Sequence, residues 1–195
     1  MKILLVSDKE DSYIWDYFDS ERFKDIELMI SCGDLKAEYL SFLVTMINAP
    51  LFYVPGNHNT SYIKEPPGGC VSIHDQLVNY NNIRLLGLGG CRRYNYGEFQ
   101  YSEDQVRNRI LKLTPKIWWN KGFDILVTHS PAYPLGDGKD LAHVGFKSYV
   151  ELIDKYSPRY FVHGHQHLNY NISPRISKYK NTTIINAYGY YILDY

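Results

Sequence analysis

The chain has 195 residues, and its 21 lysines and arginines balance its 21 aspartates and glutamates, so the formal net charge is zero with histidine neutral. A chain of this length forms one domain with a real hydrophobic core. Zero net charge argues against a protein that coats nucleic acid or an acidic membrane, because such binding needs clustered excess cations.

The sequence carries no pattern typical of a membrane span, a leader or a disulfide framework. No apolar run approaches the roughly 20 residues that a membrane span needs, and the opening apolar run is too short and too soon charged for a signal peptide. Cys32, Cys70 and Cys91 are odd in number and widely spaced, which suits neither disulfides nor a zinc ribbon. We therefore expect a single cytoplasmic domain over residues 1–195.

The first half of the chain predicts strands that alternate with helices. Short apolar runs that end in a turn indicate buried strands, and apolar residues at helical spacing indicate helices. We expect a strand over residues 2–6, a helix over 13–23, a strand over 26–31, a helix over 37–47, a strand over 51–54, an irregular stretch over 61–82 and a strand over 83–88.

The second half adds two helices and four strands. Ser102 and Gln105 form a capping-box pattern, and Glu103 and Asp104 favour the N-terminus of the same helix. The last two strands are expected to pair as a hairpin around Tyr188-Gly189. In chain order, we expect a helix over 102–113, a strand over 125–128, a loop over 135–145, a helix over 146–156 and strands over 160–162, 182–185 and 190–193.

This order of elements predicts an α/β sandwich with mixed sheets, undivided by a linker or a repeat. Open α/β sheets bind their ligands at the carboxyl ends of the strands. The loops that follow five of the expected strands are therefore where we expect a functional site.

Each of these five loops carries side chains that offer an oxygen or an imidazole nitrogen. Borderline divalent metals bind this mixture of carboxylate, carboxamide and imidazole. Taken singly, each motif also fits an ordinary turn or a packed histidine, but five in succession indicate one metal site. In chain order, the side chains are Asp8 and Glu10, Asp34, Asn57, His58 and Asn59, His129, and His165 and His167.

The order of these motifs resembles the calcineurin-like metallophosphoesterase superfamily, and the resemblance runs from Asp8 to His167. Residues 90–101 and 137–146 further resemble a subgroup of compact phosphohydrolases and phosphodiesterases. The resemblance implies a four-layer sandwich of two mixed β-sheets flanked by helices, in a single metallophosphoesterase domain. The residues that carry the resemblance are Asp8, Gly33-Asp34, Gly56-Asn57-His58, His129 and Gly164-His165-Gln166-His167.

The resemblance also implies a hydrolase with two divalent metal ions, for which Mn²⁺ is our first expectation and Fe, Zn, Ni or Mg are alternatives. Hydroxide activated by the two cations would attack phosphorus, and His58 would be the catalytic residue that protonates the leaving oxygen. In this assignment Asp34 bridges both metals, Asp8 and His167 hold the first, and Asn57, His129 and His165 hold the second.

Glu10 departs from the superfamily, which usually has histidine two positions after the first aspartate. In one interpretation Glu10 is a ligand of the first metal, which favours harder ions such as Mn²⁺ or Mg²⁺. With Asp8 and Asp34 it would then make the site less positive, and we expect a shift toward monoanionic phosphodiesters or lower activity. In the other interpretation Glu10 turns to solvent, and the first metal site is weak or empty.

Four further residues border the expected substrate side. Asn59 stands where the superfamily usually has aspartate or glutamate, and it either adjoins His58 and shifts its working pH or faces solvent. Arg92 and Arg93 could grip a phosphate bidentately or belong to a solvated loop. His143, in the loop after His129, could border the pocket.

These features predict a metal-dependent phosphoesterase that hydrolyses phosphomonoesters or phosphodiesters of a small phosphorylated substrate. We expect no membrane partner and no dedicated nucleic-acid surface, and the oligomeric state stays open. Two alternatives remain. One is a nuclease or cyclic-nucleotide phosphodiesterase that uses the same site, and the other is a catalytically weakened scaffold of the same fold that binds protein partners.

Overall fold

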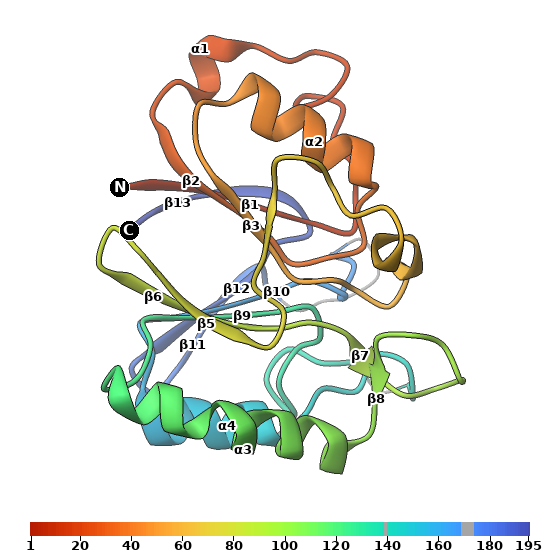
Figure 1. Cartoon of the computed structure of the whole chain (residues 1–195), viewed down its shortest axis with the longest axis vertical. Coiled ribbons are helices and arrows are strands. Elements are labelled where there is room, and N and C mark those ends of the chain that lie inside the picture. Colours follow the sequence, from red (N-terminus) through yellow and green to blue (C-terminus); the bar gives the residue numbers. More distant parts are fainter. Residues whose placement is uncertain (139, 169–173) are drawn as a thin grey trace.

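The computed structural model describes residues 1–138, 140–168 and 174–195. Across them the chain forms four layers, in which α1 and α2 cover one sheet and α3 and α4 cover the other (Figure 1). In chain order the elements are β1 (Lys2–Ser7), α1 (Ser20–Phe23), β2 (Ile26–Ser31), α2 (Ala37–Met46), β3 (Leu51–Tyr53), the 3₁₀ helix η1 (Thr60–Ile63), β4 (Val71–Ser72), β5 (Gln76–Tyr80), β6 (Ile83–Leu88), β7 (Cys91–Arg92), β8 (Gln100–Tyr101), α3 (Glu103–Trp119), β9 (Ile125–Thr128), α4 (Lys147–Tyr156), β10 (Tyr160–His163), β11 (Ile176–Tyr179), β12 (Thr182–Asn186) and β13 (Gly189–Asp194).

The first sheet has the strand order β13-β1-β2-β3-β4 over the described residues. β1 to β4 run parallel, and β13 pairs antiparallel with β1. Successive side chains of a strand point to opposite faces, so Leu4 and Val6 pack toward α2 while Ile3 and Leu5 pack between the sheets. Because both faces are covered, β1 is apolar almost throughout.

The second sheet has the order β11-β12-β10-β9-β6-β5 over the same residues. Its inner strands run parallel, and β11 and β5 pair antiparallel at the two edges. Val127 and Val162 face the first sheet, whereas Leu126 and Phe161 pack beneath α3 and α4. The expected α/β sandwich of two mixed sheets flanked by helices is therefore confirmed.

The helix expected over residues 13–23 is wrong except at its end, where α1 forms. The carboxylate of Asp19 caps the N-terminus of α1, so the helix begins only there. The preceding aromatic residues lie in turns, and Trp15 stacks on Tyr39 of α2 with ring centroids 5.1 Å apart. Trp15 and Phe18 pack against Phe42 of α2, whereas Tyr13 and Tyr17 stay exposed.

The terminal hairpin expected around Tyr188-Gly189 is also wrong. β12 belongs to the second sheet and β13 to the first, so the chain crosses between the sheets at this point. Asn186 supports the crossing, because its side chain accepts a hydrogen bond from the N–H of Tyr188 at 2.9 Å and donates one to the carbonyl of Gln166 at 2.7 Å.

The stretch over residues 61–82, expected to be irregular, contains η1, β4 and β5. β5 pairs with β6 through a two-residue turn at Asn81-Asn82. Both asparagines have positive φ, 47° and 65°, which this residue type tolerates and which tight hairpin turns require. This Asn-Asn pair is the sequence feature from which the hairpin could have been predicted.

The capping box of Ser102 and Gln105 is confirmed at the start of α3. The helix runs beyond its expected end and through Pro115, because Leu113 and Ile117 stay buried on one face against the second sheet. Within the described part of the chain, no helix combines the length and the apolar character needed to cross a membrane.

Candidate metal centre

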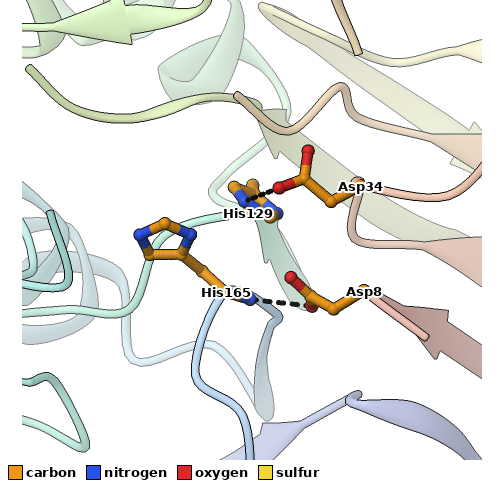
Figure 2. Close-up of side chains that lie close together, drawn as sticks. All are labelled: Asp8, Asp34, His129 and His165. Atoms are coloured by element: carbon orange, nitrogen blue, oxygen red, sulfur yellow. Dashed lines mark hydrogen bonds and ion pairs between the residues drawn. The ribbon is translucent and has the colours of Figure 1, made fainter. Parts of the chain in front are cut away.

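Four donor side chains converge where strands of both sheets end (Figure 2). Asp8 and Asp34 follow β1 and β2 of the first sheet, whereas His129 and His165 follow β9 and β10 of the second. One ligand atom from each residue lies within 4.8 Å of those of the other three. The strand ends therefore bring together four of the residues predicted to bind metal.

The backbone at three of these residues is held in an uncommon conformation. Asp8, Asp34 and His165 have φ values of 62°, 55° and 66°. Positive φ is unfavourable for residues with a Cβ and occurs where surrounding structure enforces it, often at functional sites. Three of the four converging residues adopt this conformation.

Two glycines let the backbone approach the carboxylates. A Cβ on Gly56 would overlap the carboxylate of Asp34, and a Cβ on Gly164 would overlap Ser7 and the carboxylate of Asp8. These turns therefore require residues without a side chain.

Asp8 joins the two sheets directly, since its carboxylate accepts a hydrogen bond from the backbone N–H of His165 at 2.8 Å. Burial raises the pKa of Asp8 above its ordinary value, although the neighbouring charge on His129 opposes this. A cation beside this buried carboxylate would offset the cost of burying its charge.

Asp34 and His129 form a buried pair, with Asp34 Oδ2 3.1 Å from His129 Nε2. Burial raises the pKa of Asp34, but the charge on His129 and hydrogen bonds outweigh it and lower the pKa to about 2. Burial lowers the pKa of His129, but Asp34 outweighs it and raises the pKa to about 9. The carboxylate of Asp34 is therefore ionised over the ordinary pH range.

The contacts of the two ring nitrogens of His129 show whether the site suits a cation. It is fully buried, and its Nδ1 lies 2.7 Å from the carbonyl oxygen of Cys32, which requires a hydrogen on Nδ1. Nε2 then faces two oxygens, Asp34 Oδ2 and Asn57 Oδ1, each at 3.1 Å. A proton or a metal ion at Nε2 satisfies this arrangement, and metal-binding histidines are commonly oriented by such a backbone contact. The donors present therefore fit a divalent cation.

Asn57 lies buried beside these four residues. Its Oδ1 faces His129, while its Nδ2 donates a hydrogen bond to the hydroxyl of Tyr94 at 3.2 Å. Tyr94 thereby fixes which end of the amide faces the metal centre. In the sequence, Tyr94 stands beside Arg92 and Arg93. Nothing in that position indicates that its hydroxyl contacts Asn57.

His165 lies between two other imidazoles, with ring centroids 4.8 Å from His129 and 4.9 Å from His143. Its Nε2 lies 2.8 Å from the carbonyl oxygen of Ala142, which requires a hydrogen on Nε2 and leaves a lone pair on Nδ1. Burial lowers the pKa of His165 to about 3, so the ring is neutral and able to bind metal. His143, paired with Asp140 at 2.8 Å, thus borders the site.

Asn59 is buried, contrary to the interpretation in which it faces solvent. Its Oδ1 accepts hydrogen bonds from the N–H groups of Asp34 at 2.7 Å and Gly56 at 2.8 Å. Its Nδ2 donates to the carbonyl of Leu35 at 2.9 Å. Asn59 therefore joins the loop after β2 to the loop after β3.

His58 is anchored beside the site through its backbone, because its N–H donates a hydrogen bond to Asp34 Oδ1 at 2.8 Å. Its side chain is exposed. An incoming substrate can therefore meet the imidazole of His58 without displacing other side chains.

Two of the predicted ligands, Glu10 and His167, are not among the four converging residues. Glu10 Oε1 accepts the backbone N–H of Lys36 at 3.2 Å, and Oε2 pairs with Lys36 Nζ at 3.3 Å. The ring of His167 packs against Tyr188 with centroids 4.8 Å apart. Among the described residues, neither Glu10 nor His167 contributes to the group whose ligand atoms lie within 4.8 Å of one another.

Arg92 and Arg93 both contact the start of α3. Arg92 Nη1 lies 3.4 Å from Glu103 Oε2, and Arg93 Nη2 donates a hydrogen bond to Gln105 Oε1 at 2.8 Å. A role for either arginine in holding phosphate stays a prediction.

Comparison with known proteins agrees with the motifs and the geometry. The family described as calcineurin-like phosphoesterase matches residues 1–169. The chain belongs to the calcineurin-like phosphoesterase family. The resemblance inferred from the motifs is thereby confirmed, whereas the comparison with curated proteins found no match.

Solved structures share the fold of this calcineurin-like phosphoesterase. One crystal structure matches with a TM-score of 0.71 at 15% identity, over 99% of this chain and 94% of that chain. The crystal structure of TT1561 of Thermus thermophilus matches with a TM-score of 0.65 at 13% identity, over 96% and 89%. Likeness at these identities shows the fold alone, and that fold is the four-layer sandwich.

Proposed function

We propose that this calcineurin-like phosphoesterase is a metal-dependent enzyme that hydrolyses phosphate esters of small molecules. The observation that carries the proposal is the convergence of donor atoms from Asp8, Asp34, His129 and His165 within 4.8 Å. Carboxylate and imidazole donors suit borderline divalent cations, with Mn²⁺ our first choice and Fe, Zn, Ni or Mg as alternatives. A divalent cation held there would supply positive charge for phosphoryl oxygens and acidify an attacking water.

The side chains around the site have separate tasks in this proposal. Asp8, Asp34, His129 and His165, with Asn57, would hold the cation. His58, exposed and anchored to Asp34 Oδ1 through its N–H, would protonate the leaving oxygen. General-acid help of this kind typically contributes about 10²–10⁴-fold to the rate.

Hydrolysis of p-nitrophenyl phosphate and bis(p-nitrophenyl) phosphate by the purified chain tests the proposal. We expect turnover that depends on added Mn²⁺ and falls at least about 10²-fold in Asp34→Asn, because Asp34 holds the cation. Asp154→Asn is the matched control, since Asp154 pairs with Lys180 on the surface at 2.6 Å. Equal rates in Asp34→Asn and wild type, or no turnover with any of the five metals, would contradict the proposal.

The variant His58→Ala distinguishes a role of His58 in proton donation from a role in metal binding. We expect kcat to fall by about 10²–10⁴-fold while the bound metal stays unchanged, because the imidazole of His58 acts on the leaving group. Elemental analysis and steady-state kinetics on the same preparation give both quantities. A parallel loss of metal would assign His58 to metal binding instead.

A protein-binding scaffold of the same fold is the second candidate. The pairing of Glu10 with Lys36 favours it, because a residue expected to bind metal is engaged elsewhere. Turnover by wild type that equals the background of Asp34→Asn, with single- and double-ester substrates and with cyclic nucleotides, would support the scaffold.

A further inference from the structure

We infer that the site holds one divalent cation per chain rather than two, with Glu10 neutralised by Lys36, and that it thereby favours monoanionic phosphodiesters. The inference rests on the proposed function, because it concerns the same site. Three observations carry it: the spacing of the donor atoms, the contacts of Glu10 and the balance of charges.

The four converging residues are close enough to share one centre. Ligands lie about 2.0–2.2 Å from a cation of this kind, so opposite ligands of one ion are about 4.4 Å apart. One ligand atom from each of Asp8, Asp34, His129 and His165 lies within 4.8 Å of those of the other three, so these residues can share a single ion.

Glu10 is engaged at both of its oxygens. Oε1 accepts the backbone N–H of Lys36 at 3.2 Å, and Oε2 pairs with Lys36 Nζ at 3.3 Å. The ion pair alone is weak because the side chain of Lys36 is 73% exposed, but the backbone N–H holds Oε1 independently. An ammonium at this distance also opposes a second cation on the same carboxylate, since like charges repel.

Charge balance then indicates the substrate class. One divalent cation is balanced by the carboxylates of Asp8 and Asp34, and Glu10 with Lys36 adds no net charge. A formally neutral site attracts a phosphomonoester dianion less than a site with two cations does. The monoanion of a phosphodiester carries one negative charge fewer, so it loses less electrostatic attraction than the dianion when a site has one cation instead of two.

Counting metal in the full chain tests the inference. After loading with excess Mn²⁺ and gel filtration, we expect one ion per chain in wild type and one in Glu10→Gln, which keeps an acceptor for the Lys36 N–H. Glu21→Gln is the matched control, because Glu21 forms a comparable exposed pair with Lys24 at 2.8 Å. Electron paramagnetic resonance of the loaded wild type should show the six-line signal of an isolated Mn²⁺ ion.

The outcomes separate the inference from the proposed function. Two ions per chain, or the signal of a spin-coupled pair, would overturn the inference and leave the proposed function standing. One ion in wild type and none in Glu10→Gln would also overturn it, because Glu10 would then be a ligand. No ion in wild type would overturn the proposed function together with the inference.

A separate measurement tests the proposed substrate class. We expect kcat/KM for bis(p-nitrophenyl) phosphate to exceed that for p-nitrophenyl phosphate by about tenfold or more, each relative to its rate without protein. A preference for the monoester in the preparation that holds one ion would overturn the assignment of substrate class.

Discussion

Asn59 makes three hydrogen bonds that a carboxylate at this position cannot make together. Its Oδ1 accepts from the N–H groups of Asp34 and Gly56, and its Nδ2 donates to the carbonyl of Leu35. An aspartate offers the acceptors but no donor when ionised, and it would place a second negative charge beside Asp34. Asparagine therefore joins the two loops without altering the charge of the metal centre.

Asn59→Ala should lower the free energy of unfolding by about 1–3 kcal/mol, because two buried N–H groups lose their acceptor. The affinity for Mn²⁺ should fall as well, since Asp34 loses its backbone anchor. Urea denaturation and titration calorimetry measure the two effects. Asn108→Ala, on the exposed face of α3, is the control, and a stability equal to that of the control would contradict the role of Asn59.

Gly164→Ala should weaken Mn²⁺ binding by about 10–100-fold, the loss typical of disturbed support for a ligand. The added Cβ would overlap Ser7 and the carboxylate of Asp8, so Asp8 must shift. Gly68→Ala is the control, because its Cβ would lie 3.6 Å from the nearest atom, Ser41 Oγ. Unchanged affinity in Gly164→Ala would show that Asp8 does not bind the metal.

At this scale, the sequence predicts side-chain chemistry better than side-chain contacts. Asp8, Asp34, His129 and His165 could be found because each follows an apolar strand and carries a metal-binding group. The carbonyls of Cys32 and Ala142, which set the ring nitrogens of the two histidines, could not, since every residue has a carbonyl. The pairing of Glu10 with Lys36 likewise depends on how two loops meet.

Arg84 ties three elements together. From β6, its Nε and Nη2 donate hydrogen bonds to the carboxylate of Asp124, which precedes β9, at 2.9 and 2.6 Å. Its Nη1 donates to the carbonyl of Asn120 at the end of α3 at 2.7 Å. The end of α3 is thus held to the second sheet by one guanidinium group.

The Arg84–Asp124 contact predicts a dependence of stability on pH. Hydrogen bonds from Arg84 lower the pKa of Asp124. A carboxyl group whose pKa is lower in the folded chain stabilises the fold above its unfolded pKa of about 3.9, and this is lost as the pH falls through the folded value. The difference in free energy of unfolding between wild type and Asp124→Asn should therefore be largest near pH 7 and shrink below about pH 4.

Urea denaturation of both proteins at several pH values measures this difference. Asp104→Asn, at an exposed position in the first turn of α3, serves as the control. A difference between wild type and Asp124→Asn that stays constant from pH 7 to pH 3 would contradict the prediction.

Elements decided by their own residues could be predicted, and elements decided by distant partners could not. β2 and β6 have the expected bounds, because their residues suit a strand covered on both faces. The start of α3 follows from the Ser102 cap. The pairing of β13 with β1 instead depends on residues at opposite ends of the described chain, so adjacency in sequence suggested the wrong hairpin.

Across the whole molecule, the candidate metal centre lies at the seam between the two sheets. Asp8 and Asp34 come from the first sheet, and His129 and His165 come from the second (Figure 2). A cation held by all four would cross-link the sheets, so the free energy of binding would add to the stability of the sandwich.

Mn²⁺ should therefore raise the thermal midpoint of unfolding and slow hydrogen exchange at the carboxyl ends of β1, β2, β9 and β10 together. Free metal at 100 times its dissociation constant would add about 2.7 kcal/mol to the free energy of unfolding. Thermal unfolding and hydrogen exchange read by mass spectrometry measure the effects, with Asp34→Asn as the control. Protection confined to one sheet would contradict the cross-link.

The pairing of β13 with β1 also affects the order in which the first sheet forms during synthesis of the chain. β1 emerges from the ribosome well before β13, the neighbour on its outer side, which begins only at Gly189. Until then the edge of the strand that leads to Asp8 has unpaired backbone groups, which can recruit other chains. Synthesis from the N-terminus therefore makes the strand that leads to Asp8 early and completes its sheet late, so the outer edge of β1 stays open to other chains until β13 has been made.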